Sequence, residues 1–232
     1  MPPADQTPKT HPETPPDLDW RNDLIPVSRQ FDDPYFSLAG GLEETRHVFL
    51  GGNDLPARLR EGFQVAELGF GTGLNLLALL AVHRGPERLI YTSFEAFPMP
   101  AADMERALRA FPELDVIAGP LLDQWAAGAR VLQFPNLSAR IVVGDARETL
   151  PGWEGRADAW FLDGFSPSKN PELWSPDLMR AVAAHTAPGG TFATYTAAGH
   201  VRRALAEAGF AVSRSPGFGR KRHMTTGRLA GL

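Results

Sequence analysis

After Gly62 the sequence alternates short apolar runs with segments of helical periodicity, and this alternation restricts the possible folds more than any other feature. The apolar runs predict strands at residues 63–68, 89–94, 140–143, 157–162, 191–195 and 211–213, and a final short strand near 224–225. The helices predicted between them cover residues 74–82, 101–110, 176–185 and 200–208. Alternation of this kind indicates βαβ units, and we therefore expect an α/β fold with a parallel sheet.

The chain divides into three segments by composition. Residues 1–19 are rich in proline and poor in large apolar residues, so we expect a disordered tail. Aromatic residues return over 20–61, which predicts a folded N-terminal cap. Residues 62–232 form the predicted sheet domain, with a long insertion at 96–139 between its second and third strands.

Several classes of chemistry are excluded or disfavoured. The 232 residues include no cysteine, which excludes disulfides, iron–sulfur clusters and thiolate nucleophiles. The six histidines have no ligand spacing, so we expect no metal site. The longest apolar run falls well short of the about 20 residues of a membrane helix, and the N-terminus has no apolar signal region. We expect a cytoplasmic monomer.

Positive charge is concentrated at the C-terminal end of the chain. The whole sequence has a formal charge of −4, yet from residue 201 onward the only acid is Glu207, and the cations are Arg202, Arg203, Arg214, Arg220, Lys221, Arg222 and Arg228. A basic end on an acidic body favours a polyanionic partner. A solvated surface without a partner is the alternative.

The first predicted strand leads directly into a glycine-rich loop with the sequence Glu67-Leu68-Gly69-Phe70-Gly71-Thr72-Gly73. Glycines at a strand-to-helix turn let the backbone approach a ligand closely. The dinucleotide fingerprint G-x-G-x-x-G fails, because its sixth position is Leu74. The spacing G-x-G-x-G after an acid resembles the loop of S-adenosylmethionine-dependent methyltransferases. A purely structural turn is the alternative.

Three acids follow later strands of the predicted sheet. Glu95 ends the second strand, where a carboxylate can accept hydrogen bonds from both ribose hydroxyls. Asp145 follows the third strand, where it can accept the adenine amino hydrogens, and Asp163 ends the fourth. Open α/β sheets bind ligands at this edge. Each acid taken alone is also compatible with an ordinary helix cap.

The segment from Asp163 to Trp174, DGFSPSKNPELW, is more specific. Together with the glycine loop, Phe94-Glu95-Ala96, the segments at 31–37, 48–53 and 189–196, and Gly217-Phe218-Gly219-Arg220-Lys221-Arg222, it resembles the methyltransferase domain of the MnmC/MnmD family. The resemblance spans residues 24–228. It implies a class I S-adenosylmethionine-dependent methyltransferase fold, Rossmann-like, with a small N-terminal cap.

The resemblance also implies an activity. Family members methylate the exocyclic amine of 5-aminomethyl-(2-thio)uridine at the tRNA wobble position, with S-adenosylmethionine as donor and the anticodon stem-loop as partner. Many carry a C-terminal flavin-dependent oxidase domain, and we expect a stand-alone transferase here. The residues expected at the cofactor are Glu67, Gly69, Phe70, Gly71, Gly73, Asn75, Glu95, Asp145, Ala146 and Asp163.

Asp163 is the expected catalytic residue, because a carboxylate beside the donor can orient the amine and accept its proton. Phe165 is expected to stack on the uridine, with core packing as the alternative. Lys169 and Asn170 are expected to hold phosphate or sugar at the mouth of the pocket, with a helix cap as the alternative for either. Arg220, Lys221 and Arg222 are expected to supply the positive charge that attracts tRNA. The other functions considered are a methyltransferase with another acceptor and a catalytically silent module that binds tRNA or a protein. The sequence leaves open which tRNAs are used, whether 2-thiolation is required, and which enzyme supplies the amine.

Overall fold

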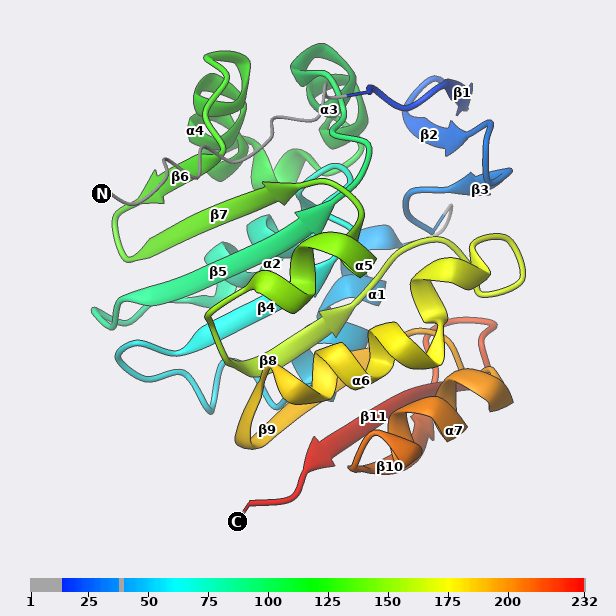
Figure 1. Ribbon diagram of the computed structural model, residues 1–232. Helices are drawn as coiled ribbons and strands as arrows, with labels where there is room; N and C mark the ends of the chain where they lie inside the picture. The colour runs from blue at the N-terminus through cyan, green and yellow to red at the C-terminus, as the bar shows by residue number, and fades with distance from the viewer. Residues whose placement is uncertain (1–13, 38–39, 232) are drawn as a thin grey trace, which may run out of the picture.

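A mixed eight-stranded sheet forms the centre of the protein, which is represented by a computed structural model describing residues 14–37 and 40–231 (Figure 1). The strand order is β10-β11-β9-β8-β4-β5-β7-β6. The bounds are β4 (Gln64–Leu68), β5 (Leu89–Glu95), β6 (Val131–Phe134), β7 (Leu137–Val143), β8 (Ala157–Leu162), β9 (Thr186–Thr194), β10 (Phe210–Pro216) and β11 (His223–Leu229). The five strands from β7 to β9 are parallel, and β6 and β11 run antiparallel to their neighbours. The predicted α/β fold is confirmed.

Helices cover both faces of the sheet. One buried cluster includes Val65 and Phe161 and packs against α1 (Gly41–Thr45), α2 (Leu74–Val82), α3 (Ala101–Leu108) and α4 (Asp115–Ala126). The other includes Ala66 and Trp160 and packs against α5 (Ala146–Thr149), α6 (Pro176–Ala184) and α7 (Gly199–Glu207). Neighbouring residues of β4 and β8 thus point to opposite faces, as the strand period of two requires. Figure 1 shows α5 and α6 in front of the sheet and α2 behind it.

Short helical turns complete the chain. They are the π-helical η1 (Arg46–Gly51) and the 3₁₀ turns η2 (Pro112–Leu114), η3 (Leu150–Gly152) and η4 (Pro171–Trp174). Within the range described, no helix combines the length and the apolar character needed to cross a membrane.

The N-terminal segment forms a small antiparallel sheet of β1 (Leu18–Arg21), β2 (Ile25–Ser28) and β3 (Asp33–Pro34). This sheet lies at the edge toward which the arrows of β5, β7 and β8 point (Figure 1). Strand β1 begins inside the range 1–19 assigned to a tail, so that boundary is wrong by two residues; residues 1–13 lie outside the described part. The apolar side chains of α1 and η1 join the core cluster of α2.

Four strands, β7, β9, β10 and β11, are at least three residues longer than the sequence predicts. Strand β7 begins at Leu137 because it forms a hairpin with β6 inside the predicted insertion. Strand β9 begins at Thr186, although Pro188, Gly189 and Gly190 resemble a strand-breaking turn. The sheet accommodates this segment with a register shift between Ala157 and Ala159.

Candidate active site

A cavity of about 1740 Å³ lies at the carboxyl edge of the parallel strands. Its walls come from the loops after β4, β5, β7 and β8, from the N-terminal cap and from the β10–β11 turn. It is larger than the roughly 300–1,000 Å³ of a typical small-molecule pocket, so two reactants fit together. The sequence-predicted residues on its wall are Gly69, Phe70, Gly71, Asn75, Glu95, Asp145, Ala146, Asp163, Phe165, Lys169, Asn170, Arg220 and Lys221, whereas Glu67, Gly73 and Arg222 are not lining residues.

The glycine loop adopts a backbone that only glycine accepts readily. Gly69, Gly71 and Gly73 have φ values of +81°, +53° and +79°, in the left-handed region. A Cβ at Gly71 would lie 3.1 Å from the Tyr35 ring, and one at Gly73 would lie 2.9 Å from Leu121. Gly73 is the N-cap of α2, and it packs against Leu121 and Phe70 instead of lining the cavity.

Glu95 holds the glycine loop in place from the end of β5. Its Oε2 accepts a hydrogen bond of 2.8 Å from the Gly71 N–H, and its Oε1 accepts one of 2.7 Å from Phe97. Burial raises the pKa of the Glu95 carboxyl, and the backbone hydrogen bonds oppose that shift. The Phe70 and Ala96 N–H groups also stabilise the ionised carboxylate, which lies on the cavity wall.

Asp145 caps helix α5. Its Oδ1 accepts a 2.8 Å hydrogen bond from the Arg147 N–H, and its Oδ2 lies 2.5 Å from the Arg147 guanidinium. This contact lowers the pKa of Asp145 below its usual value. Asp145 thus acts as a helix cap, which is the alternative that the sequence left open. Its carboxylate is also paired with Arg147, so a ligand that binds Asp145 has to share it with this arginine.

A hydrogen-bond network under the loop joins two acids through Asn75. The Asn75 amide nitrogen donates 2.8 Å bonds to both Glu67 and Asp163, and its oxygen accepts a 3.0 Å bond from the Thr45 hydroxyl. Ser93 donates a 2.7 Å bond to the other oxygen of Glu67. Glu67 is fully buried, and burial raises its pKa to about 8. It therefore supports Asn75 from below instead of reaching the cavity.

Asp163 faces the cavity at the end of β8. It also accepts a 2.8 Å bond from the Gly164 N–H. Burial raises the pKa of Asp163 to about 6, and the bonds from Gly164 and Asn75 limit the rise. A carboxyl group with this pKa is mostly ionised at neutral pH and can accept a proton.

Aromatic rings close one side of the cavity. Phe165 stacks on Phe31 with ring centres 4.8 Å apart and meets Tyr35 edge-on at 5.0 Å, while Phe31 contacts Phe97 at 6.2 Å. One face of Phe165 is thus covered by Phe31, because the cap folds over it, and cannot stack on a base in this arrangement.

Lys169 binds the N-terminal cap. Its ammonium contacts the Asp32 carbonyl and lies 3.0 Å from the Asp32 carboxylate and 3.9 Å from Asp33. Asp33 also accepts a 2.8 Å bond from the Ser166 N–H. Lys169 and Asn170 both line the cavity, and Asn170 precedes η4, so the expected contact with phosphate or sugar stays a prediction. A phosphate would meet a Lys169 ammonium that is already paired with Asp32.

The three cations of the β10–β11 turn have different surroundings. Lys221 bonds to Glu44 at 2.6 Å and lies 4.4 Å from the centre of the Tyr195 ring. Arg220 and Arg222 are exposed and pair with no carboxylate of residues 14–37 or 40–231. Of the three cations of this turn, Arg220 and Arg222 thus present unpaired positive charge to solvent within the described part of the chain.

Sequence reasoning missed four residues that shape the cavity, namely Tyr35, Glu44, Thr45 and Tyr195. Tyr35 and Tyr195 lie inside segments that carry the family resemblance, which was the available signal. Glu44 had no distinguishing signal, because Glu43-Glu44 resembles the acidic first turn of a helix.

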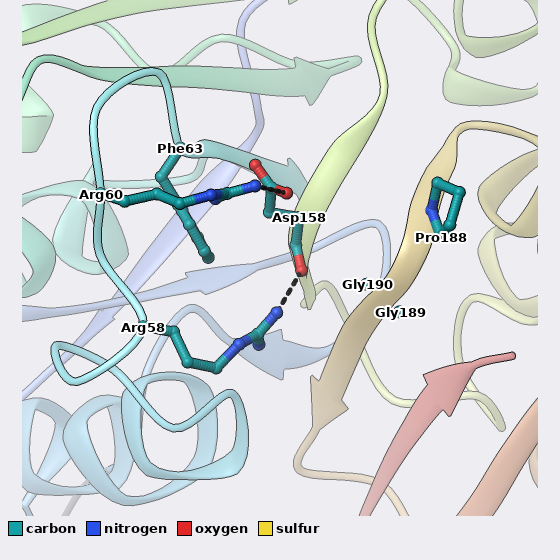
Figure 2. A pocket seen from close by; sticks show the side chains of 7 residues that line it. All are labelled: Arg58, Arg60, Phe63, Asp158, Pro188, Gly189 and Gly190. Atoms are coloured by element: carbon teal, nitrogen blue, oxygen red, sulfur yellow. Dashed lines mark hydrogen bonds and ion pairs between the residues drawn. The ribbon is translucent and has the colours of Figure 1, made fainter. Parts of the chain in front are cut away.

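A second pocket of about 220 Å³ lies at the opposite, amino edge of the sheet (Figure 2). Its charged groups bind one another: Arg60 pairs with the Asp158 carboxylate at 2.8 Å, and Arg58 donates to the Asp158 carbonyl at 3.1 Å. We interpret it as structural. In the described part of the chain, no group of three or more histidine, aspartate or glutamate residues is placed to hold a metal ion.

Comparison with known proteins decides the class of enzyme. A family model described as "S-adenosyl-L-methionine-dependent methyltransferase" matches residues 112–230, about half of the chain. The chain belongs to this methyltransferase family. The tRNA 5-methylaminomethyl-2-thiouridine biosynthesis bifunctional protein MnmC of Caulobacter sp. (strain K31) is 49% identical over 221 residues, covering 88% of the methyltransferase and 37% of the relative. The protein of the same name from Chromohalobacter salexigens is 47% identical, covering 93% and 33%. The methyltransferase thus spans about a third of the length of these relatives.

The fold comparison agrees. The crystal structure of MnmC2 from Aquifex aeolicus superimposes with a TM-score of 0.72 at 27% identity, covering 95% of the methyltransferase and 72% of that chain. The predicted class I Rossmann-like fold and the S-adenosylmethionine donor are confirmed.

The residues present fit this cofactor. The left-handed backbone of Gly69 and Gly71 leaves a cradle at the cavity wall that side chains would narrow. Glu95 lies at the end of β5 on the cavity wall, and a carboxylate at this edge can accept hydrogen bonds from ribose hydroxyls. The predicted contacts of the glycine loop with the methionine part of the cofactor and of Glu95 with its ribose are compatible with this geometry and stay predictions.

Proposed function

We propose that this methyltransferase transfers a methyl group to the exocyclic amine of 5-aminomethyl-(2-thio)uridine at the wobble position of tRNA, giving the 5-methylaminomethyl nucleoside. The observation that carries the proposal is the position of Asp163, whose carboxylate lies at the end of β8 and lines the same cavity as the glycine loop. A Cβ at Gly69 would lie 3.4 Å from the backbone of Gly164. The names of the relatives, which give the biosynthesis of tRNA 5-methylaminomethyl-2-thiouridine, support tRNA as the substrate and the 5-methylaminomethyl nucleoside as the product.

The proposed chemistry needs a neutral amine. S-adenosylmethionine supplies a methyl group on a positively charged sulfur. A primary alkylammonium has no lone pair until its proton leaves, and Asp163, ionised above about pH 6, accepts that proton and orients the nitrogen. Asn75 and the Gly164 N–H hold the carboxylate in position.

The target base has to leave its stack to reach the cavity. Phe31, Phe97 and Phe165 provide an apolar wall for the extruded base. Arg220 and Arg222, on the β10–β11 turn, supply positive charge for the phosphates of the anticodon stem-loop.

The test is transfer of labelled methyl from S-adenosylmethionine to total tRNA from cells that cannot complete the wobble methylamino step, with fully modified tRNA as control. Nucleoside analysis then locates the label. We expect label in 5-methylaminomethyl-(2-thio)uridine from the deficient tRNA alone. Label in another nucleoside would assign another acceptor, and cofactor binding without any label in tRNA would contradict a tRNA substrate.

A further inference from the structure

Glu44 is a buried acid on the cavity wall that the proposed chemistry leaves without a role. It lies on α1 of the N-terminal cap, and only 8% of the residue is exposed. A carboxylate buried to this extent requires a cation or hydrogen-bond donors. Its partner is the Lys221 ammonium at 2.6 Å, supplied by a turn 177 residues later in the sequence.

The Lys221 ammonium occupies a site formed by two recognition groups. Glu44 supplies a charge-assisted hydrogen bond, and the Tyr195 ring lies 4.4 Å away with its centre toward the ammonium. A carboxylate combined with an aromatic face is a binding site for an alkylammonium. Lysine presents a primary ammonium on a methylene group, which is also what 5-aminomethyluridine presents.

This site adjoins Asp163 through two routes. The Tyr195 hydroxyl donates a 2.8 Å bond to the carbonyl of Gly164, the residue after Asp163. Thr45, next to Glu44, bonds to Asn75, which bonds to Asp163. An ammonium held between Glu44 and Tyr195 therefore lies beside the proposed proton acceptor.

The lysine and its binding site differ in their freedom to move. Lys221 comes from a tight turn, in which a Cβ at Gly217 would lie 2.1 Å from the Lys221 carbonyl, and 46% of its side chain is exposed. The Glu44 side chain is only 11% exposed and belongs to a helix packed in the core. The lysine side chain can swing outward to solvent, whereas the acid stays in the wall.

We propose that Glu44 and Tyr195 form the subsite for the primary ammonium of the substrate, and that Lys221 fills this subsite until the substrate displaces it. The inference rests on the proposed function, because only an amine-bearing acceptor brings the second cation. It makes Glu44 the residue that selects an aminomethyl uridine over an unmodified one. It also assigns Lys221 a role different from a phosphate contact.

The experiment compares the affinity of the full chain for two anticodon stem-loop RNAs, one with 5-aminomethyluridine and one with uridine at the wobble position. In Glu44→Gln, we expect the preference for the amine-bearing RNA to fall at least tenfold. In Lys221→Met, the unpaired carboxylate accepts the substrate ammonium without competition, and we expect the preference to rise at least threefold. Tyr195→Leu removes the aromatic face while leaving the acid, and we expect a preference between those of the wild type and Glu44→Gln.

Glu43→Gln is the matched control, because Glu43 is the preceding residue on the same helix, is half exposed and does not line the cavity. It is expected to leave the preference unchanged. S-adenosylmethionine binding by every variant reports an intact fold. An unchanged preference in Glu44→Gln, or an equal loss of affinity for both RNAs in Lys221→Met, would overturn the subsite while wild-type methylation upholds the proposed function. Failure of the wild type to methylate the amine-bearing RNA would overturn the proposed function and this inference with it.

Discussion

Asn75 and Asp163, 88 residues apart in the sequence, are joined by a hydrogen bond of 2.8 Å from the amide nitrogen to the carboxylate. The same nitrogen binds Glu67, so one side chain supports both the proposed proton acceptor and a buried acid below it. Because a bond to the charged form lowers the pKa of an acid, Asn75 keeps Asp163 ionised at a lower pH than burial alone would allow.

Replacing Asn75 tests this relationship. In Asn75→Ala, the pKa of Asp163 is expected to rise, and the acid limb of the kcat/KM profile moves to higher pH. The substitution also removes the hydrogen bonds that Asn75 donates to Glu67 and to Asp163. Loss of these bonds is expected to lower the free energy of unfolding by about 1–3 kcal/mol. The measurement is kcat/KM between pH 5 and 9, with Asn136→Ala, remote from the cavity, as control. If Asn75 instead binds the cofactor directly, the acid limb stays in place and the Kd for S-adenosylmethionine rises.

The sequence predicts the parts of this site that local patterns encode. The glycine loop and the acids Glu95 and Asp163 were found because each lies at the end of a predicted parallel strand, and such ends meet at one edge. Asp145 was also predicted, but the sequence does not show that its carboxylate pairs with Arg147.

Contacts between distant segments could not be predicted. Lys169 meets Asp32 across 137 residues, and no pattern near Lys169 distinguishes a cation that binds the cap from one that faces RNA. Lys221 and Glu44 present the same problem. The burial of Glu67 was also hidden, because the residue before a glycine loop can point into the cavity or into the core.

The raised pKa of Glu67 predicts a pH dependence of stability. The folded protein keeps this proton up to about pH 8, whereas an unfolded carboxyl loses it near its usual value of 4.5. The folded state thus binds more protons between these values, and its free energy of unfolding falls as pH rises through them. In Glu67→Gln this contribution disappears, so the variant's stability relative to wild type should increase from pH 5 to pH 8. Urea unfolding at several pH values measures it, with exposed Glu105→Gln as control; parallel pH profiles for Glu67→Gln and wild type would contradict the assignment.

Gly71 should tolerate no side chain. Its left-handed φ of +53° costs an alanine roughly 1–2 kcal/mol, and the new Cβ presses on Tyr35 at 3.1 Å. Gly71→Ala is expected to lower the free energy of unfolding by that amount and to weaken S-adenosylmethionine binding at least tenfold in calorimetry. Gly152→Ala is the control: Gly152 is exposed, its φ is not in the left-handed region, and apart from its chain neighbours no atom lies within 4 Å of the added Cβ, so the free energy of unfolding should change by less than about 0.5 kcal/mol. Unaltered cofactor binding by Gly71→Ala would argue against the loop as the cofactor cradle.

Arg220 and Arg222, on the β10–β11 turn, should each neutralise a tRNA phosphate and so make tRNA binding weaken as the salt concentration rises. Each cation that neutralises a phosphate adds about 0.7–0.9 to the slope of log K against log salt. The double variant Arg220→Ala/Arg222→Ala is expected to reduce that slope by about 1.4–1.8 while cofactor affinity stays constant. Filter binding from 50 to 300 mM salt measures the slope, with Arg109→Ala, at the C-cap of α3, as control. A slope equal to that of wild type would remove these arginines from the RNA interface.

In the proposed reaction, Asp163 accepts the proton of the amine in a cavity shared with the cofactor. General base catalysis contributes about 10²–10⁴-fold to a rate, so Asp163→Asn should lose at least 100-fold in methyl transfer while keeping its fold and its cofactor affinity. The most direct measurement is single-turnover methylation of amine-bearing tRNA at saturating S-adenosylmethionine, from pH 5 to 9. The methylation rate of the wild type should rise with pH through about pH 6. The rate of Asp163→Asn should stay low and show no such rise near pH 6. Methylation by Asp163→Asn at near wild-type rate with the same pH profile would contradict a role for Asp163 as the proton acceptor.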